Sequence, residues 1–125
     1  MEQTFGSYVR EKRMARGLSL RALASKLEVS PVYMSNIEND RRPAPIREKL
    51  NHLIEILGLC QADAERLLDL AAKSRTQRVS ADLPDYIMER DIVRAALRTA
   101  KEVDATDEEW QEFIDRITRR EKPGN

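Results

Sequence analysis

The stretch LASKLEVSPVYMSNIENDRRPAP, residues 23–45, decides the fold. Its apolar residues recur at helical spacing, and Ser30 is a residue type that caps helix starts. Pro31 suits the first helical position, because its missing N–H would have no partner there. The following residues carry more hydroxyl and amide groups than a helix built only for packing requires. We therefore predict two short helices joined by a tight turn, with the second helix meeting the binding partner.

The flanking residues extend this pair into an all-α fold. Gly17 and Gly58 are typical helix stops, and Ser19 is a typical N-cap. Apolar spacing predicts five helices in a first domain over residues 1–72, at about 4–16, 20–27, 30–39, 46–57 and 63–72. In the first of these helices, Met14 is expected near the apolar side. Residues 73–82 are polar and aperiodic, which indicates a linker or an exposed loop.

A small helical region is predicted over residues 83–120. Residues 83–90 form a short helix in this interpretation, and Asp91 caps the helix that follows it. Thr106 and Glu109 match a capping box that opens a final helix.

Composition and charge limit the function classes. The chain has 125 residues, 41% hydrophobic and 35% charged, with a net charge of zero. Residues 1–58 hold ten Arg/Lys and seven Asp/Glu, a net charge of +3, and residues 59–125 hold twelve and fifteen, a net charge of −3. The positive half therefore contains the helix pair, as a polyanionic partner requires.

Neither membrane insertion nor export is expected. No apolar run approaches the roughly 20 residues of a membrane span, and the N-terminus lacks a signal-peptide core. Cys60 is the one cysteine, which excludes a disulfide framework. Its apolar neighbours predict a buried thiol, and a cytoplasmic location fits.

The sequence contains no recognisable motif for catalysis or metal binding. His52 is the one histidine and has no second His or Cys at metal-ligand spacing, so we predict a partly buried helix residue. No glycine-rich phosphate loop is present. We expect no enzymatic activity, no cofactor and no metal.

The stretch GLSLRALASKLEVSPVYMSNIENDRRPAP, residues 17–45, resembles the helix-turn-helix of phage-repressor-like regulators, the XRE family. Ala24 stands where the family places the small residue between the two helices. The apolar positions that lock the pair are also in register, namely Leu23, Leu27, Val29, Met34 and Ile37. The resemblance covers about residues 5–70 and implies a sequence-specific regulator that binds double-stranded DNA.

The resemblance also implies roles for individual residues. Ser30–Asn39 is then the recognition helix. Residues placed to read base edges are Pro31, Val32, Ser35 and Asn36. Residues placed to contact phosphates are Ser19, Ser30, Tyr33, Asn39, Arg41 and Arg42. Arg13 and Glu38 match a family salt bridge that orients the recognition helix.

Two positions depart from the family pattern. Glu28 stands where a turn glycine is common, and a left-handed conformation there would cost about 1 kcal/mol. Leu20 stands where a glutamine often supports a phosphate contact, which Leu20 cannot make.

The C-terminal helices leave two interpretations open. One apolar stripe holds Ile92, Val93, Ala96, Leu97 and Ala100, and another holds Trp110, Phe113, Ile114 and Ile117. These stripes either cover each other or the first domain, or they form a homodimer interface. The main hypothesis is a dimeric repressor. The alternative is an antitoxin or adaptor that binds a toxin or an ImmA/IrrE-type metallopeptidase through these helices.

Overall fold

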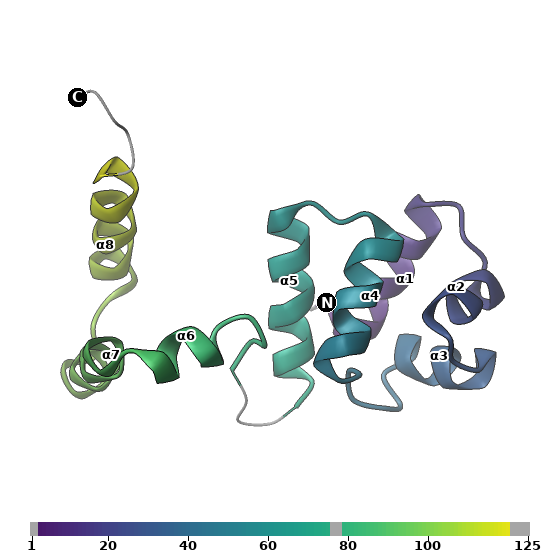
Figure 1. Ribbon diagram of the computed structural model, residues 1–125, viewed down its shortest axis with the longest axis horizontal. Coiled ribbons are helices and arrows are strands. Elements are labelled where there is room, and N and C mark those ends of the chain that lie inside the picture. Colours follow the sequence, from purple (N-terminus) through teal and green to yellow (C-terminus); the bar gives the residue numbers. More distant parts are fainter. Residues whose placement is uncertain (1–2, 76–78, 121–125) are drawn as a thin grey trace. The chain divides into compact units, whose positions relative to one another are not determined.

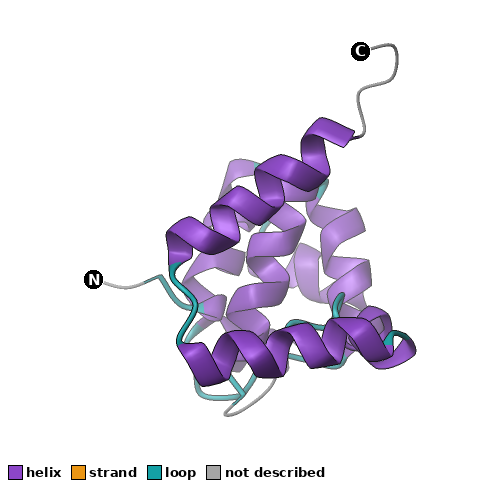
Figure 2. Cartoon of the chain, turned by 90° about the vertical axis from the view of Figure 1, so that its left-hand side faces the viewer, coloured by secondary structure: helices purple, strands orange, loops and turns teal. Residues whose placement is uncertain are grey.

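The computed structural model describes residues 3–75 and 79–120, and these form helices and loops without any strand (Figures 1 and 2). The helices are α1 (Phe5–Ala15), α2 (Leu20–Leu27), α3 (Pro31–Glu38), α4 (Arg47–Leu57), α5 (Gln61–Lys73), α6 (Pro84–Glu89), α7 (Asp91–Val103) and α8 (Asp107–Arg120). The all-α prediction is therefore confirmed. No helix within the described ranges is long and apolar enough to cross a membrane.

The chain divides into two compact units, Met1–Asp85 and Tyr86–Asn125, called here the first and the second unit. The first unit contains the five helices predicted near the N-terminus, and their ends lie within two residues of the predicted ones. Ser19 caps α2 as predicted, since its hydroxyl accepts a hydrogen bond from the backbone N–H of Ala22 at 3.0 Å. Local capping signals thus located these helices well.

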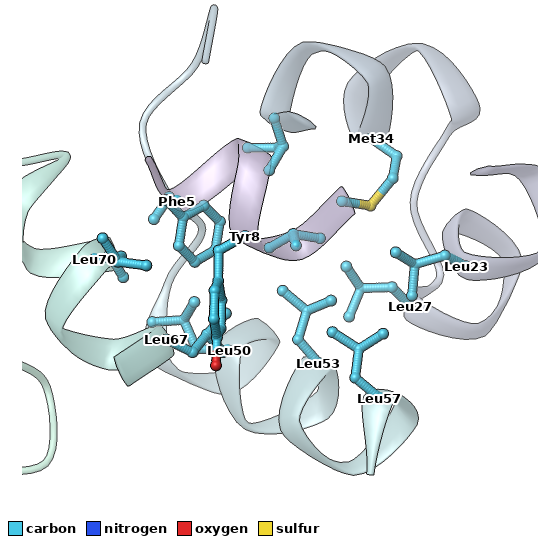
Figure 3. Packing of buried hydrophobic residues seen from close by; sticks show 14 of the residues in the cluster. Phe5, Tyr8, Leu23, Leu27, Met34, Leu50, Leu53, Leu57, Leu67 and Leu70 are labelled. Carbon is cyan, nitrogen blue, oxygen red and sulfur yellow. The ribbon is translucent and has the colours of Figure 1, made fainter. Parts of the chain in front are cut away.

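One hydrophobic core holds α1 to α5 together, and Figure 3 shows its packing. The small residue Ala24 is fully buried between α2 and its neighbours, as expected. Of the five residues predicted to lock the helix pair, Val29 is partly buried, and the other four lie in the core, namely Leu23, Leu27, Met34 and Ile37. Leu50, Leu53 and Leu57 of α4 and Leu67 of α5 close this core from the other side.

Three predictions about burial were wrong. Cys60 is exposed, because it occupies the N-cap position of α5, outside the helix face that packs inward. His52 is exposed on α4 instead of partly buried. Met14, expected near the apolar side of the first helix, is 65% exposed in the last turn of α1.

The segment expected to be a linker or an exposed loop, residues 73–82, lies partly against the first unit. Ser80 is buried, and its hydroxyl donates a hydrogen bond to the carboxylate of Asp69 on α5. The guanidinium of Arg47 on α4 donates to the carbonyl of Ala81. The end of this segment therefore belongs to the first unit, while residues 76–78 lie outside the described ranges.

The second unit contains α7 and α8. The predicted capping box is confirmed, since Glu109 N–H donates to the Thr106 hydroxyl at 3.1 Å and Thr106 N–H donates to the Glu109 carboxylate at 3.0 Å. Asp91 does not cap α7 as predicted. It is the first helical residue, where its carboxylate pairs with Arg94 one turn later.

Candidate nucleic-acid interface

The turn between α2 and α3 has the geometry of a helix-turn-helix. Glu28 ends α2 in the left-handed conformation, at φ 61° and ψ 44°, the strained arrangement considered for this position. The Lys49 ammonium donates a hydrogen bond at 2.9 Å to the carbonyl of Leu27, the last residue of α2. Ser30 then caps α3, accepting from the N–H of Tyr33 at 3.0 Å. Side-chain hydrogen bonds at the end of α2 and at the start of α3 thus hold the strained turn in place.

Close contact between α1 and α3 fixes the position of α3. A Cβ atom at Gly6 would lie 2.5 Å from the carbonyl oxygens of both Ile37 and Glu38, so only glycine fits here. Directly after α3, the Asp40 carboxylate accepts from the Gly6 N–H at 3.0 Å and from the Thr4 hydroxyl at 2.6 Å. The start of α1 is therefore bonded to the end of α3.

A buried ion pair adds a second connection between the same two helices. Arg13 on α1 donates two hydrogen bonds to the Glu38 carboxylate, at 2.7 and 3.0 Å, and the Glu38 side chain is 2% exposed. Another guanidinium nitrogen of Arg13 donates to the carbonyl of Leu18 at 2.9 Å. Hydrogen bonding to Glu38 raises the pKa of Arg13 above its ordinary value. Arg10 reaches the same carboxylate at 3.4 Å.

The opposite face of α3 is open. Met34, Ile37 and Glu38 are buried, whereas Pro31 is exposed and Val32 is 70% exposed. Ser35 and Asn36 are partly exposed between these two groups. The Asn36 side chain has no hydrogen bond to any described residue, so its amide is available to an external partner. The four residues predicted to read bases thus lie outside the buried face.

The six residues predicted to contact phosphates lie within α3 or in the segments before and after it in the sequence. Five are exposed, namely Ser19, Ser30, Asn39, Arg41 and Arg42, and Tyr33 is partly buried. The two serine hydroxyls accept cap hydrogen bonds, which leaves each O–H free to donate. The structure also brings Arg42 over the ring of Tyr33, 5.5 Å from its centroid.

Asn39 is more constrained than its sequence position indicates. Its amide nitrogen donates to the Ser35 carbonyl at 2.9 Å, and its amide oxygen accepts from Arg10 at 2.8 Å. The same nitrogen also donates to the Ser35 hydroxyl at 3.4 Å, so the Asn39 amide is largely engaged within the first unit. Sequence reasoning missed Arg10, Asp40 and Lys49, because their contacts join residues 22 to 36 positions apart and follow no local pattern.

The electrostatics of this face favour an anion. Four cationic residues on α2 and in the segment after α3 are exposed, namely Arg21, Lys26, Arg41 and Arg42. None of them forms an ion pair with another described residue. The carboxylates of Glu38 and Asp40 are occupied by internal donors, and Glu28 in the turn is the exposed carboxylate of the helix pair. The surface can therefore offer several donors to phosphate oxygens.

A curated protein, in two strains, and one solved structure are similar to this chain. The HTH-type transcriptional regulator RamB of Mycobacterium tuberculosis, strains CDC 1551/Oshkosh and H37Rv, is 37% identical over 93 residues. This match covers 74% of the present chain but 18% of RamB, so the chain spans less than a fifth of that relative. A solved structure, "SINR PROTEIN/SINI PROTEIN COMPLEX", covers 94% of this chain and 97% of its own, with 21% identity and a TM-score of 0.48. That degree of likeness assigns no function.

The helix-turn-helix domain family matches residues 4–68, more than half of the chain. This range includes every contact described above between α1, α2 and α3. The match agrees with the resemblance to phage-repressor-like regulators, and the chain belongs to the helix-turn-helix domain family.

Proposed function

We propose that this chain is a sequence-specific regulator of transcription that binds double-stranded DNA and reads the major groove with α3. The observation that supports this most directly is the division of α3 into two faces. Glu38 and its neighbours are tied to α1, while Val32 and Asn36 remain available on the other side. A helix fixed in this way projects into a groove at a defined angle.

The two classes of residue act differently in this proposal. Asn36 donates to and accepts from a base edge, most simply that of adenine, and Val32 contacts a thymine methyl group. The exposed Arg41 and Arg42 contact phosphates, which contribute affinity and register without choosing a sequence. The pair Arg13 and Glu38 orients the recognition helix.

Equilibrium binding of fluorescent duplexes tests this division of roles. With a duplex chosen by selection, Asn36→Ala lowers affinity by about 1–3 kcal/mol and reduces discrimination at one base pair of each half-site. Arg41→Ala weakens binding to all duplexes alike and reduces the salt slope by about one. Arg98→Ala, an exposed position on α7, serves as the control for loss of a surface charge. Identical effects of the Asn36 and Arg41 variants would contradict the assignment.

The regulator acts in the cytoplasm as a homodimeric repressor in this proposal. Two recognition helices reach successive major grooves when they are presented about 34 Å apart, which a two-fold dimer provides. The second unit supplies the contact surface in this proposal, because its large apolar residues are exposed, including Ile92, Leu97, Trp110, Phe113, Ile114 and Ile117. Short helices of this kind are marginal alone and gain stability from a partner surface.

The same exposed residues support a second candidate function, an antitoxin or adaptor. In this alternative, α7 and α8 bind a toxin or a metallopeptidase through the apolar residues, and DNA binding persists through α3. The mass of the purified chain distinguishes the two. A dimer in sedimentation supports the homodimer, whereas a monomer that co-purifies with the product of a neighbouring gene supports the alternative.

A further inference from the structure

A hollow of about 810 Å³ lies in the first unit. The walls are formed by the start of α1, the segment after α3, and α5 from Arg66 to its C-terminal end. Its volume falls within the range of small-molecule sites. Four cationic side chains line it, Arg41, Arg42, Arg66 and Lys73, so we call it the basic hollow.

The basic hollow has a large excess of positive charge. Its one acidic residue is Asp40, whose two oxygens already accept hydrogen bonds from Thr4 and Gly6. The four cations and this carboxylate give the lining a net charge of +3. No described residue forms an ion pair with any of the four cations. Arg66 has one hydrogen bond, a 3.3 Å contact with the amide oxygen of Gln3.

We propose that the basic hollow binds a small molecule with two phosphoryl groups. Arginine guanidinium groups match phosphate oxygens with paired hydrogen bonds, and three arginines from two different segments of the chain line this hollow. The N-terminal end of α1 is part of the same wall, and the Asp40 carboxylate already accepts a hydrogen bond from the Gly6 N–H there, so the excess charge comes from the four cationic side chains. A ligand with two to four negative charges balances this lining.

The ligand also competes with DNA, because Arg41 and Arg42 belong both to the basic hollow and to the phosphate-contacting set. A guanidinium that holds the ligand is withdrawn from the duplex backbone. Binding of the small molecule therefore weakens duplex binding, and by linkage the duplex weakens binding of the small molecule to the same degree. This second part rests on the proposed function, whereas binding of the small molecule does not.

Isothermal titration of the full chain with inorganic pyrophosphate tests the site. We expect one pyrophosphate per chain, and the double variant Arg66→Gln/Lys73→Gln should bind it about ten-fold more weakly, because charge-assisted hydrogen bonds are lost. The control is Arg98→Gln/Lys101→Gln, which removes the same charge from exposed positions on α7. Unchanged helicity by circular dichroism confirms that both variants fold. Equal weakening in both variants, or no binding by the original chain, overturns the proposal.

Duplex titrations distinguish a free phosphate compound from the DNA backbone as the occupant. If Arg66→Gln/Lys73→Gln weakens duplex binding and lowers its salt slope while pyrophosphate does not bind, the hollow is part of the DNA surface and the proposal is wrong. If pyrophosphate binding falls in that variant and the chain ignores duplexes, the anion site stands and the proposed function fails.

Discussion

Replacing Arg13 with methionine would test how much the buried ion pair between α1 and α3 contributes to stability. The Glu38 side chain is 2% exposed, and Arg13 supplies its two shortest hydrogen bonds. Breaking a buried pair by removing one partner costs about 3–5 kcal/mol, because a charge is left buried without compensation. Arg10 remains at 3.4 Å but is 46% exposed, so it compensates only in part. We therefore expect Arg13→Met to lower the free energy of unfolding by about 3 kcal/mol, the lower limit of this range.

The double variant Arg13→Met/Glu38→Leu separates desolvation from orientation. With both charges gone, the buried-charge penalty disappears, and the free energy of unfolding should return to within about 1 kcal/mol of the original. Duplex affinity should nevertheless stay about ten-fold weaker, because the hydrogen bonds that orient α3 against α1 are missing.

Urea unfolding followed by circular dichroism at pH 7 gives the free energies, and fluorescence anisotropy with a selected duplex gives the affinities. Lys12→Met is the matched control, since Lys12 also lies on α1 and forms an ion pair, with the more exposed Asp63. A double variant as unstable as Arg13→Met alone would refute the desolvation argument. A double variant that regains full affinity would refute the orienting role.

Three further variants test other parts of the structure. Gly6→Ala should lower the free energy of unfolding in urea by about 1–3 kcal/mol, because the added Cβ would clash with two backbone oxygens of α3. Gly17→Ala has open space but a φ of 69°, so thermal unfolding should show a smaller loss of about 1 kcal/mol. Glu28→Gly should raise the free energy of unfolding by about 1 kcal/mol in urea, because glycine adopts the left-handed conformation without strain. A lower free energy of unfolding would contradict the strain argument. Ile114→Glu should convert a dimer into a monomer in sedimentation, whereas Arg116→Gln, with the same charge change on α8, should not.

Local sequence signals predicted the helices because their ends depend on neighbouring residues. The range Leu20–Leu27 followed from the Ser19 cap and the junction at Val29-Ser30-Pro31, and the structure has the same ends. The prediction for Cys60 was wrong because apolar sequence neighbours do not show which way a side chain points. Cys60 is the N-cap residue of α5 and lies outside the helix face that packs inward.

Long-range contacts around the candidate interface could not be predicted in this way. Arg10 meets Asn39, and Asp40 meets Gly6, only after α1 and α3 have packed together. The pairing of Arg13 with Glu38 was anticipated from the family resemblance and not from spacing, since 25 positions separate the two residues. The cations of the basic hollow are likewise scattered over residues 41–73 and gather only in the folded unit.

Selection of random duplexes by the original chain and by Asn36→Ala tests the role of α3 most directly. The account predicts that the original chain enriches a two-fold symmetric sequence with half-sites about one helical turn apart. Asn36→Ala should enrich the same sequence with one base pair in each half-site no longer specified. Failure of the original chain to enrich any sequence, or an identical enriched sequence for both proteins, would contradict the claim that α3 reads DNA.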